Sequence, residues 1–259
     1  MLRLFYIFIF TALISACTTS PTGRSQLIMM PDNQINQMGL QAFDTLKSDK
    51  KISYNPQYNQ ASQCIAQAIV GEVGGSWEVV VFEDESPNAF ALPGNKIGVH
   101  TGMLRLVQNQ EQLAAVIGHE VGHVLAKHSN ERASQELAVK GGMNILGAMT
   151  MPTSALGQLG FGLLGVGAEY GVLKPWGRTQ ESEADMISVD LMAKAGFDPH
   201  HSIGLWQRME QATQGKGNVE FLSTHPSHAT RIQDLEQHMP QAMSLFQQAQ
   251  AMGKQPHCI

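Results

Sequence analysis

The 259-residue sequence has few charged residues, few cysteines and no repeated segments. Only 15% of its residues are charged and the formal net charge is −5. No cluster of lysine and arginine is present, which excludes recognition of nucleic acid through its phosphates. Once a leader is removed, about 240 residues remain, and this length fits one domain with one sizeable core.

The N-terminal segment predicts a lipoprotein signal. Residues 1–16 carry one charge, Arg3, and then an apolar run over 4–14 that is too short to span a bilayer. The run ends in Leu-Ile-Ser-Ala-Cys, which resembles a bacterial lipobox and predicts lipidation of Cys17. Thr18 follows where an aspartate would favour the inner membrane, so we expect sorting to the periplasmic face of the outer membrane of a Gram-negative cell. Ordinary secretion with cleavage elsewhere is the alternative.

The remaining organisation is expected to be simple. We expect the lipidated N-terminus and a tether to cover 17–32, of which 18–26 is polar, one folded domain to cover 33–240, and a helical tail to cover 241–259. In an oxidising periplasm Cys64 and Cys258 either form a disulfide that ties the tail to an early helix or stay apart.

Five consecutive residues carry the strongest chemical signal, the run His119-Glu120-Val121-Gly122-His123. On a helix, His119 and His123 leave the same face one turn apart, a spacing that lets two neutral imidazoles share one Zn²⁺. Glu120 is then placed as the general base for a zinc-activated water. The flanking residues are apolar almost all round, which predicts a buried helix, and Gly118 and Gly122 predict close backbone packing against another element. A metal-free histidine pair is the alternative.

The third metal ligand must come from elsewhere in the chain. A metzincin would place a histidine at Ser129, so that pattern fails, and His128 is expected to be a polar residue near a helix C-terminus. A later helix, beginning near residue 178, carries Glu181 and Asp185 on one face. We expect Glu181 to bind the metal and Asp185 to accept the N–H of a ligand histidine. The alternative is a solvated acidic first turn, the environment expected for Glu183.

The periodicity predicts an α+β fold that is mostly helical, with a small β-sheet beside the His-Glu-x-x-His helix. The motif on that helix is typical of a zincin-type domain. Strands are expected at 77–82, 88–92 and 96–100, the last two forming a hairpin. Helices are expected at 33–48, 56–72, 109–130, 131–149, 178–195, 199–213 and 228–251. Residues 141–171 are rich in glycine and small apolar residues and suit a mobile lid over the cleft, a buried helical hairpin or, least well, a membrane span.

Several motifs occur in an order that resembles a known family. They are Asn88-Ala-Phe-Ala-Leu-Pro-Gly94, His119-Glu-Val-Gly-His123, Glu181-x-x-Ala184-Asp185, and Thr224-His225-Pro226 followed by Arg231. Together they resemble the gluzincin metallopeptidases of the CAAX prenyl protease and HtpX type, more narrowly the periplasmic branch that includes BepA and LoiP. The resemblance covers roughly residues 25–240.

The resemblance implies one Zn²⁺ per chain and roles for further residues. Asn88, Ala89 and Phe90 would form the cleft edge to which an extended substrate adds as a strand, unless they belong to an ordinary hairpin. His225 and Arg231 would stabilise the oxyanion. Alternatively, His225 closes the resting site as a fourth ligand and Arg231 forms a structural ion pair.

The expected function is that of a zinc endopeptidase of the bacterial cell envelope. Its substrates would be unfolded or misassembled proteins, and outer-membrane assembly machinery is an expected partner. One alternative is a periplasmic chaperone or scaffold for outer-membrane proteins with a structural zinc. Another is a zinc aminopeptidase, but no motif indicates the pocket that such an enzyme needs for a free N-terminal amine.

Overall fold

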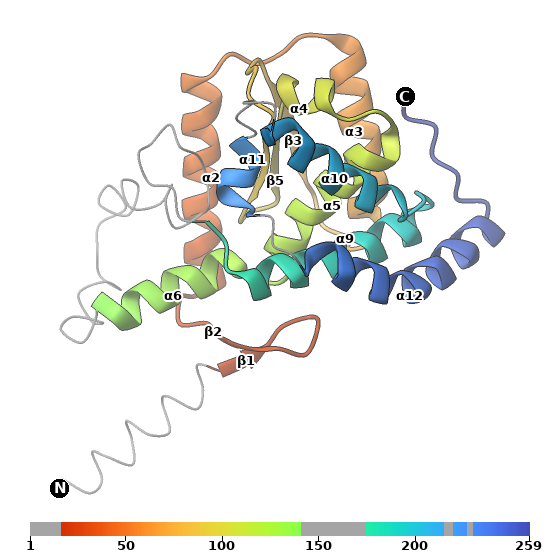
Figure 1. Cartoon of the computed structure of the whole chain (residues 1–259). Coiled ribbons are helices and arrows are strands. Elements are labelled where there is room, and N and C mark those ends of the chain that lie inside the picture. The colour runs from red at the N-terminus through yellow and green to blue at the C-terminus, as the bar shows by residue number, and fades with distance from the viewer. Residues whose placement is uncertain (1–16, 141–174, 215–219, 227–229) are drawn as a thin grey trace, which may run out of the picture.

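A computed structural model describes residues 17–140, 175–214, 220–226 and 230–259 (Figure 1). The expected leader and the 141–171 segment lie outside these residues. The elements are β1 (Cys17–Thr19), β2 (Ser25–Leu27), α2 (Asp32–Asp49), α3 (Pro56–Gly71), β3 (Glu78–Phe82), β4 (Ala89–Leu92), β5 (Lys96–His100), α4 (Thr101–Leu106), α5 (Gln110–Leu125), α6 (His128–Lys140), α9 (Arg178–Ala195), α10 (His201–Gln214), α11 (Glu220–Thr224) and α12 (Arg231–Ala251). The predicted fold class, mostly helical with a small sheet, is confirmed.

The central sheet has the strand order β3-β5-β4. β4 and β5 form the expected antiparallel hairpin, with Ala91 opposite Ile97. Its turn places Gly94 at φ 85° and Asn95 at φ 62°, a region in which glycine and asparagine are tolerated. The sequence did not indicate that β3 pairs in parallel with β5. As a result, β4 lies at one edge of the sheet.

The core forms where α5 packs between the sheet and α9. Leu113, Ile117 and Val121 of α5 and Val189 and Met192 of α9 are all fully buried in one cluster. α12 packs along the outer side of α9, and the two helices run side by side in Figure 1. The residues from His119 to His123 of α5 are therefore buried, as the apolar sequence around them predicts.

Two glycines let α5 and α9 approach closely, as expected from the sequence. A Cβ atom added at Gly122 would lie 2.9 Å from the carbonyl oxygen of Ala184. One added at Gly118 would lie 2.8 Å from Oγ of Ser188. The backbones of the two helices are thus in contact at these positions, which brings side chains of α9 within reach of those of α5.

The boundary between α5 and α6 differs from expectation, whereas α12 ends at residue 251 as expected. α5 ends at Leu125, and α6 begins at His128 instead of near 131, because Lys127 adopts a left-handed conformation with φ 53°. α12 continues to Ala251 with Pro240 inside it, so the expected boundary between domain and tail at 240 falls within a helix. The short helices α4 and α11 were not predicted, since segments this short carry too little periodicity.

The N-terminal residues expected to form a polar tether are folded onto the domain. β1 and β2 pair as an antiparallel hairpin in which Thr18 lies opposite Gln26. Gln26 is buried, and its Nε2 donates to the carbonyl of Ala126 at 3.0 Å. Figure 1 shows this hairpin beside α6 and α9. Among the helices of the described ranges, none combines the length and the apolarity needed to cross a bilayer.

A disulfide joins the end of the chain to α3. Cys64 and Cys258 are bonded, with their Cα atoms 5.5 Å apart. The bond spans 194 positions of sequence and fixes the extended segment that follows α12.

Candidate metal centre

Four buried side chains converge between α5, α9 and the end of α11. They are His119 and His123 of α5, Glu181 of α9 and His225, and each offers one ligand atom within 4.8 Å of the others. His119 Nε2 lies 3.1 Å from His123 Nε2, which in turn lies 3.3 Å from Oε1 of Glu181. Donors about 2.0–2.1 Å from one tetrahedral zinc would stand roughly 3.3 Å apart. The nitrogen and oxygen donors therefore fit Zn²⁺.

Unsatisfied polar atoms also indicate a cation at this place. Oε2 of Glu181 is buried and forms an ion pair with Arg231 Nη1 at 2.8 Å, but it accepts no hydrogen bond from the described residues. Burial opposes protonation of His119, but the charges of Glu181 and Asp185 outweigh it and raise the pKa of His119 to about 9. The cluster favours positive charge, and a divalent cation would supply it.

Glu120 lies beside the cluster without belonging to it. Its Oε2 accepts the N–H of Ala91 in β4 at 3.1 Å. Its Oε1 lies 3.3 Å from Nε2 of His225 and has no hydrogen-bond partner among the described residues. Burial raises the pKa of Glu120 above its ordinary value. A carboxylate with a raised pKa and one free oxygen suits a general base near neutral pH.

His119 is oriented by a carboxylate and an arginine. Its Nδ1 lies 2.9 Å from Oδ1 of Asp185, the contact expected from the sequence. Arg231 donates to both oxygens of Asp185, at 2.5 Å from Nε and 2.9 Å from Nη2. Although burial opposes ionisation, the positive charges of Arg231 and His119 hold the pKa of Asp185 below its ordinary value. Asp185 therefore stays ionised and accepts the N–H of His119.

The surroundings of Arg231 match the ion pair that was the alternative to an oxyanion donor. The side chain is buried, its nitrogens face Asp185 and Glu181, and its Cζ stacks 3.3 Å from the centroid of the Trp206 ring. Each guanidinium nitrogen contacts a group of the described chain: Nε and Nη2 contact Asp185, and Nη1 contacts Glu181 and the carbonyl of Pro226. Arg231 thus forms an ion pair with the two carboxylates.

His128, expected as a polar residue near a helix C-terminus, and Glu183, expected in a solvated first turn, are both buried. Nδ1 of His128 lies 2.8 Å from Nδ1 of His123, and its Nε2 lies 3.1 Å from Oε2 of Glu183. Arg24 of the N-terminal hairpin donates to the same Oε2 at 2.8 Å. Sequence reasoning missed Arg24, and the only signal was a charged residue within an otherwise polar segment.

His225 occupies the position of a fourth ligand. Its Nδ1 lies 2.9 Å from Oε1 of Glu181 and 3.1 Å from Nε2 of His119. It follows α11, whose Phe221 N–H donates to the carbonyl of Pro87 at 3.1 Å, and the Phe221 ring stacks on the His225 ring. α11 therefore lies against the chain just before β4 and carries His225 over the cluster.

The predicted cleft edge is formed by the main chain of β4. The outward N–H groups of β4 belong to Ala89, which bonds Oδ1 of Asn88 at 2.9 Å, and to Ala91, which bonds Glu120. Phe90 points the other way and packs with Phe43 in a second core cluster. The Phe90 side chain therefore belongs to the core, and substrate addition at β4, which was expected through the main chain, stays a prediction with which the outward N–H groups of Ala89 and Ala91 are compatible.

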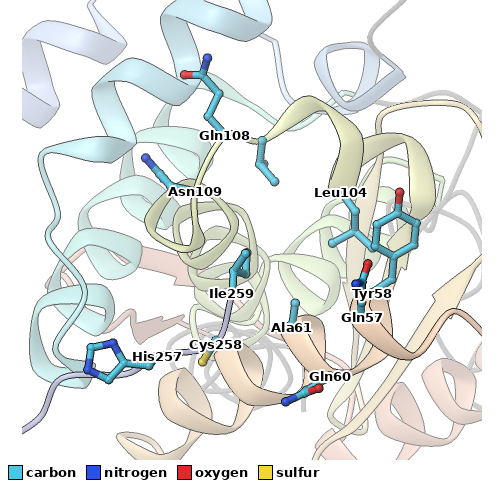
Figure 2. A pocket seen from close by; sticks show the side chains of 11 residues that line it. Gln57, Tyr58, Gln60, Ala61, Leu104, Gln108, Asn109, His257, Cys258 and Ile259 are labelled. Atoms are coloured by element: carbon cyan, nitrogen blue, oxygen red, sulfur yellow. The ribbon is translucent and has the colours of Figure 1, made fainter.

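Two pockets differ in their relation to this centre. One of about 140 Å³ is bordered by His123, Pro93 and residues of α2. Another of about 520 Å³ lies between the start of α3, the loop after α4 and the last three residues, and none of the four clustered side chains lines it (Figure 2).

Comparison with known proteins relates the chain to metallopeptidases. A sequence model of Peptidase family M48 matches residues 57–239. The mitochondrial metalloendopeptidase OMA1 of Schizosaccharomyces pombe is 38% identical over 193 residues, which cover 73% of this chain and 55% of that protein. OMA1 of Homo sapiens is 32% identical over 263 residues, 93% of this chain and 49% of that protein.

A bacterial relative is also similar at lower identity. The Beta-barrel assembly-enhancing protease of Escherichia coli is 26% identical over 230 residues, which cover 85% of this chain and 47% of that protein. The chain thus spans about half the length of the curated relatives it matches. Because the mitochondrial proteins are the more similar of these three, the narrower resemblance to the BepA and LoiP branch stays a prediction.

Proposed function

The chain belongs to peptidase family M48, and from that premise we propose that it is a zinc endopeptidase of the bacterial cell envelope that hydrolyses unfolded or misassembled proteins. One observation carries the proposal: four buried donors converge on one point with the carboxylate of Glu120 beside them. A buried cluster of this kind is costly unless it holds a cation. A free base next to it indicates chemistry rather than structure alone.

The roles of the residues follow from their positions. His119, His123 and Glu181 would hold the zinc, which when bound polarises a carbonyl and lowers the pKa of water. Glu120 would take the proton of the attacking water and deliver it to the leaving amine, since its Oε1 is free and its pKa is raised. Asp185 would keep the proton of His119 on Nδ1 and leave Nε2 to face the metal.

The edge strand β4 would align the substrate. Its outward N–H groups, on Ala89 and Ala91, are hydrogen-bonded to the side chains of Asn88 and Glu120 in this state. An extended peptide would replace these two partners with its own carbonyls, through contacts that depend little on sequence. Such recognition suits unfolded chains. His225 in the fourth position then represents a closed, resting arrangement.

Several features support a location in the envelope, which remains part of the proposal. The lipobox-like residues before Cys17 predict a lipid anchor at the outer membrane. The disulfide between Cys64 and Cys258 is expected to persist only in an oxidising compartment. A relative named for β-barrel assembly makes outer-membrane assembly machinery a candidate partner.

A scaffold or chaperone with a structural zinc is the second candidate, and His225 favours it. Structural zinc sites have four protein ligands and no open position, and the four side chains here would meet that description. The two candidates differ in whether Glu120 has a function, so one substitution separates them.

Zinc content and casein cleavage of residues 17–259 carrying Cys17→Ser, with and without Glu120→Gln, test the proposal. We expect both proteins to hold one zinc per chain and cleavage to fall about 10²–10⁴-fold in the variant, the usual contribution of a general base. Glu111→Gln on the same helix is the matched control and should cleave normally.

Cleavage that survives Glu120→Gln would contradict the assignment of the base. If the parent holds zinc and does not cleave, His225→Ala decides between the two candidates. A closed peptidase becomes active when the fourth donor is removed, whereas a scaffold stays inactive.

A further inference from the structure

We infer that His128, Glu183 and Arg24 form a relay that positions His123 for metal binding, so that the N-terminal hairpin is a working part of the metal centre. The inference rests on the proposed function, because it takes His123 to be a metal ligand. It assigns positioning roles to three residues for which no such role was expected.

The relay runs without a gap from the hairpin to the ligand. Arg24 Nε donates to Oε2 of Glu183 at 2.8 Å, and that oxygen lies 3.1 Å from Nε2 of His128. Nδ1 of His128 lies 2.8 Å from Nδ1 of His123, whose Nε2 faces Glu181 at 3.3 Å. The side chains of His128 and Glu183 are 0% and 2% exposed, so water does not compete with these contacts.

The chemistry of the donors fixes where each proton lies. An ionised carboxylate only accepts, so His128 donates from Nε2 to Glu183 and its Nδ1 carries a lone pair. That lone pair accepts the proton of His123 Nδ1, which leaves Nε2 of His123 unprotonated and facing the cluster. A neutral imidazole in this tautomer is the form that binds zinc.

His119 is oriented in a parallel way on the other side of the site. There the carboxylate of Asp185 contacts the ligand directly, and Arg231 holds that carboxylate. For His123 an imidazole is inserted between ligand and carboxylate, and the arginine comes from the hairpin. Each metal-binding histidine is thus backed by one carboxylate and one arginine.

The hairpin is built to hold Glu183. Thr22 Oγ1 donates to Oε1 of Glu183 at 2.6 Å, so both carboxylate oxygens are occupied. Arg24 is itself held by a bidentate contact with Glu131 of α6, at 2.6 and 2.8 Å. Gly23, at φ 89°, forms the turn that presents both side chains. Contacts that served only to attach the hairpin to the domain would not need to connect, through His128, to the proposed metal ligand His123.

The zinc affinity of the intact protein tests the relay independently of its cleavage of substrate. We would measure the zinc dissociation constant by competition with a chelator, the visible absorption of the Co²⁺-loaded protein, and the urea midpoint of the metal-free protein. His128→Leu should raise the zinc dissociation constant about 10–100-fold, the usual effect of losing a residue that orients a ligand, and alter the Co²⁺ spectrum. His128→Asn, which restores an oxygen acceptor for His123, should recover most of the affinity.

Arg24→Met and Lys254→Met form a matched pair at partly exposed ion pairs. Lys254 bonds Glu72 at 2.6 Å, away from the relay residues. We expect only Arg24→Met to weaken zinc binding and shift the Co²⁺ spectrum, although both should lower the urea midpoint slightly. If His128→Leu fails to fold, this pair alone decides.

Parent-like zinc affinity and spectra in His128→Leu and Arg24→Met would overturn the inference while leaving the proposed function intact. A parent protein that binds no zinc would overturn both. Loss of stability without any change in zinc affinity would show the hairpin to be a structural clamp only, which also refutes the relay.

Discussion

Replacing Arg231 with methionine is expected to destabilise the protein strongly, because it leaves two buried carboxylates without their cation. Arg231 is fully buried between Asp185 and Glu181 and stacks on Trp206. Methionine fills much of the same volume, so the main loss is electrostatic. Removing one partner of a buried ion pair typically costs about 3–5 kcal/mol, a large part of the roughly 5–15 kcal/mol that stabilises a domain.

Urea unfolding of the metal-free protein measures this loss. With an m-value of about 2–3 kcal/mol/M, the upper part of the usual range for small proteins, the midpoint should fall by roughly 1–2.5 M. Arg105→Met is the control, because Arg105 pairs with Glu85 at the exposed surface and should cost about 1 kcal/mol or less. Arg231→Lys should lie between the two, since lysine keeps the charge and loses the bidentate geometry.

The outcome distinguishes the two roles considered for Arg231. A midpoint within about 0.3 M of the parent, together with loss of cleavage, would refute the structural role derived from these contacts. It would restore the oxyanion donor expected from the sequence.

Two further predictions concern stability. Cys64→Ser should lower the free energy of unfolding by about 2–5 kcal/mol, because the disulfide closes a loop spanning 194 positions; coincident urea curves with and without reductant in the parent would contradict this. Burial, with the nearby charge of Lys50, lowers the pKa of His100 to about 4, below its ordinary 6.5. Since the unfolded chain then takes up the proton first, His100 should make stability fall as the pH drops from about 6.5 to 4, and His100→Gln should flatten that slope in pH-dependent unfolding. Parallel pH profiles of parent and variant would count against it.

The residues that follow helical spacing were the predictable part of the site. His119 with His123, and Glu181 with Asp185, are pairs four positions apart on single helices, and the structure brings them together at the expected faces. The hairpin of β4 and β5 was likewise visible, because its turn residues require positive φ. Sequence spacing is enough to predict contacts when a single helix or hairpin determines their geometry.

The relay could not be predicted because it depends on contacts between distant segments. Glu183 lies two positions after Glu181, on a different face of α9, which reads as solvated when α9 is considered alone. Its partner Arg24 is 159 positions away. His128 was placed at a helix end, but the left-handed turn at Lys127 makes it the first residue of a new helix and directs it inwards. Burial of a charged residue follows from its partner, and sequence spacing does not identify that partner.

Because α5 and α9 are in close contact, the geometry of the proposed metal site depends on two glycines, Gly118 and Gly122, which carry no functional group. The ligands sit on both helices, so the separation of the helix axes sets the distance from His119 and His123 to Glu181. Gly118 and Gly122 hold that separation at its minimum, where a single added carbon would meet Ser188 or the Ala184 carbonyl. A side chain at either glycine would push the helices apart and lengthen the distances between the side chains of α5 and Glu181. We therefore expect substitution at these glycines to weaken metal binding as well as the packing of the core.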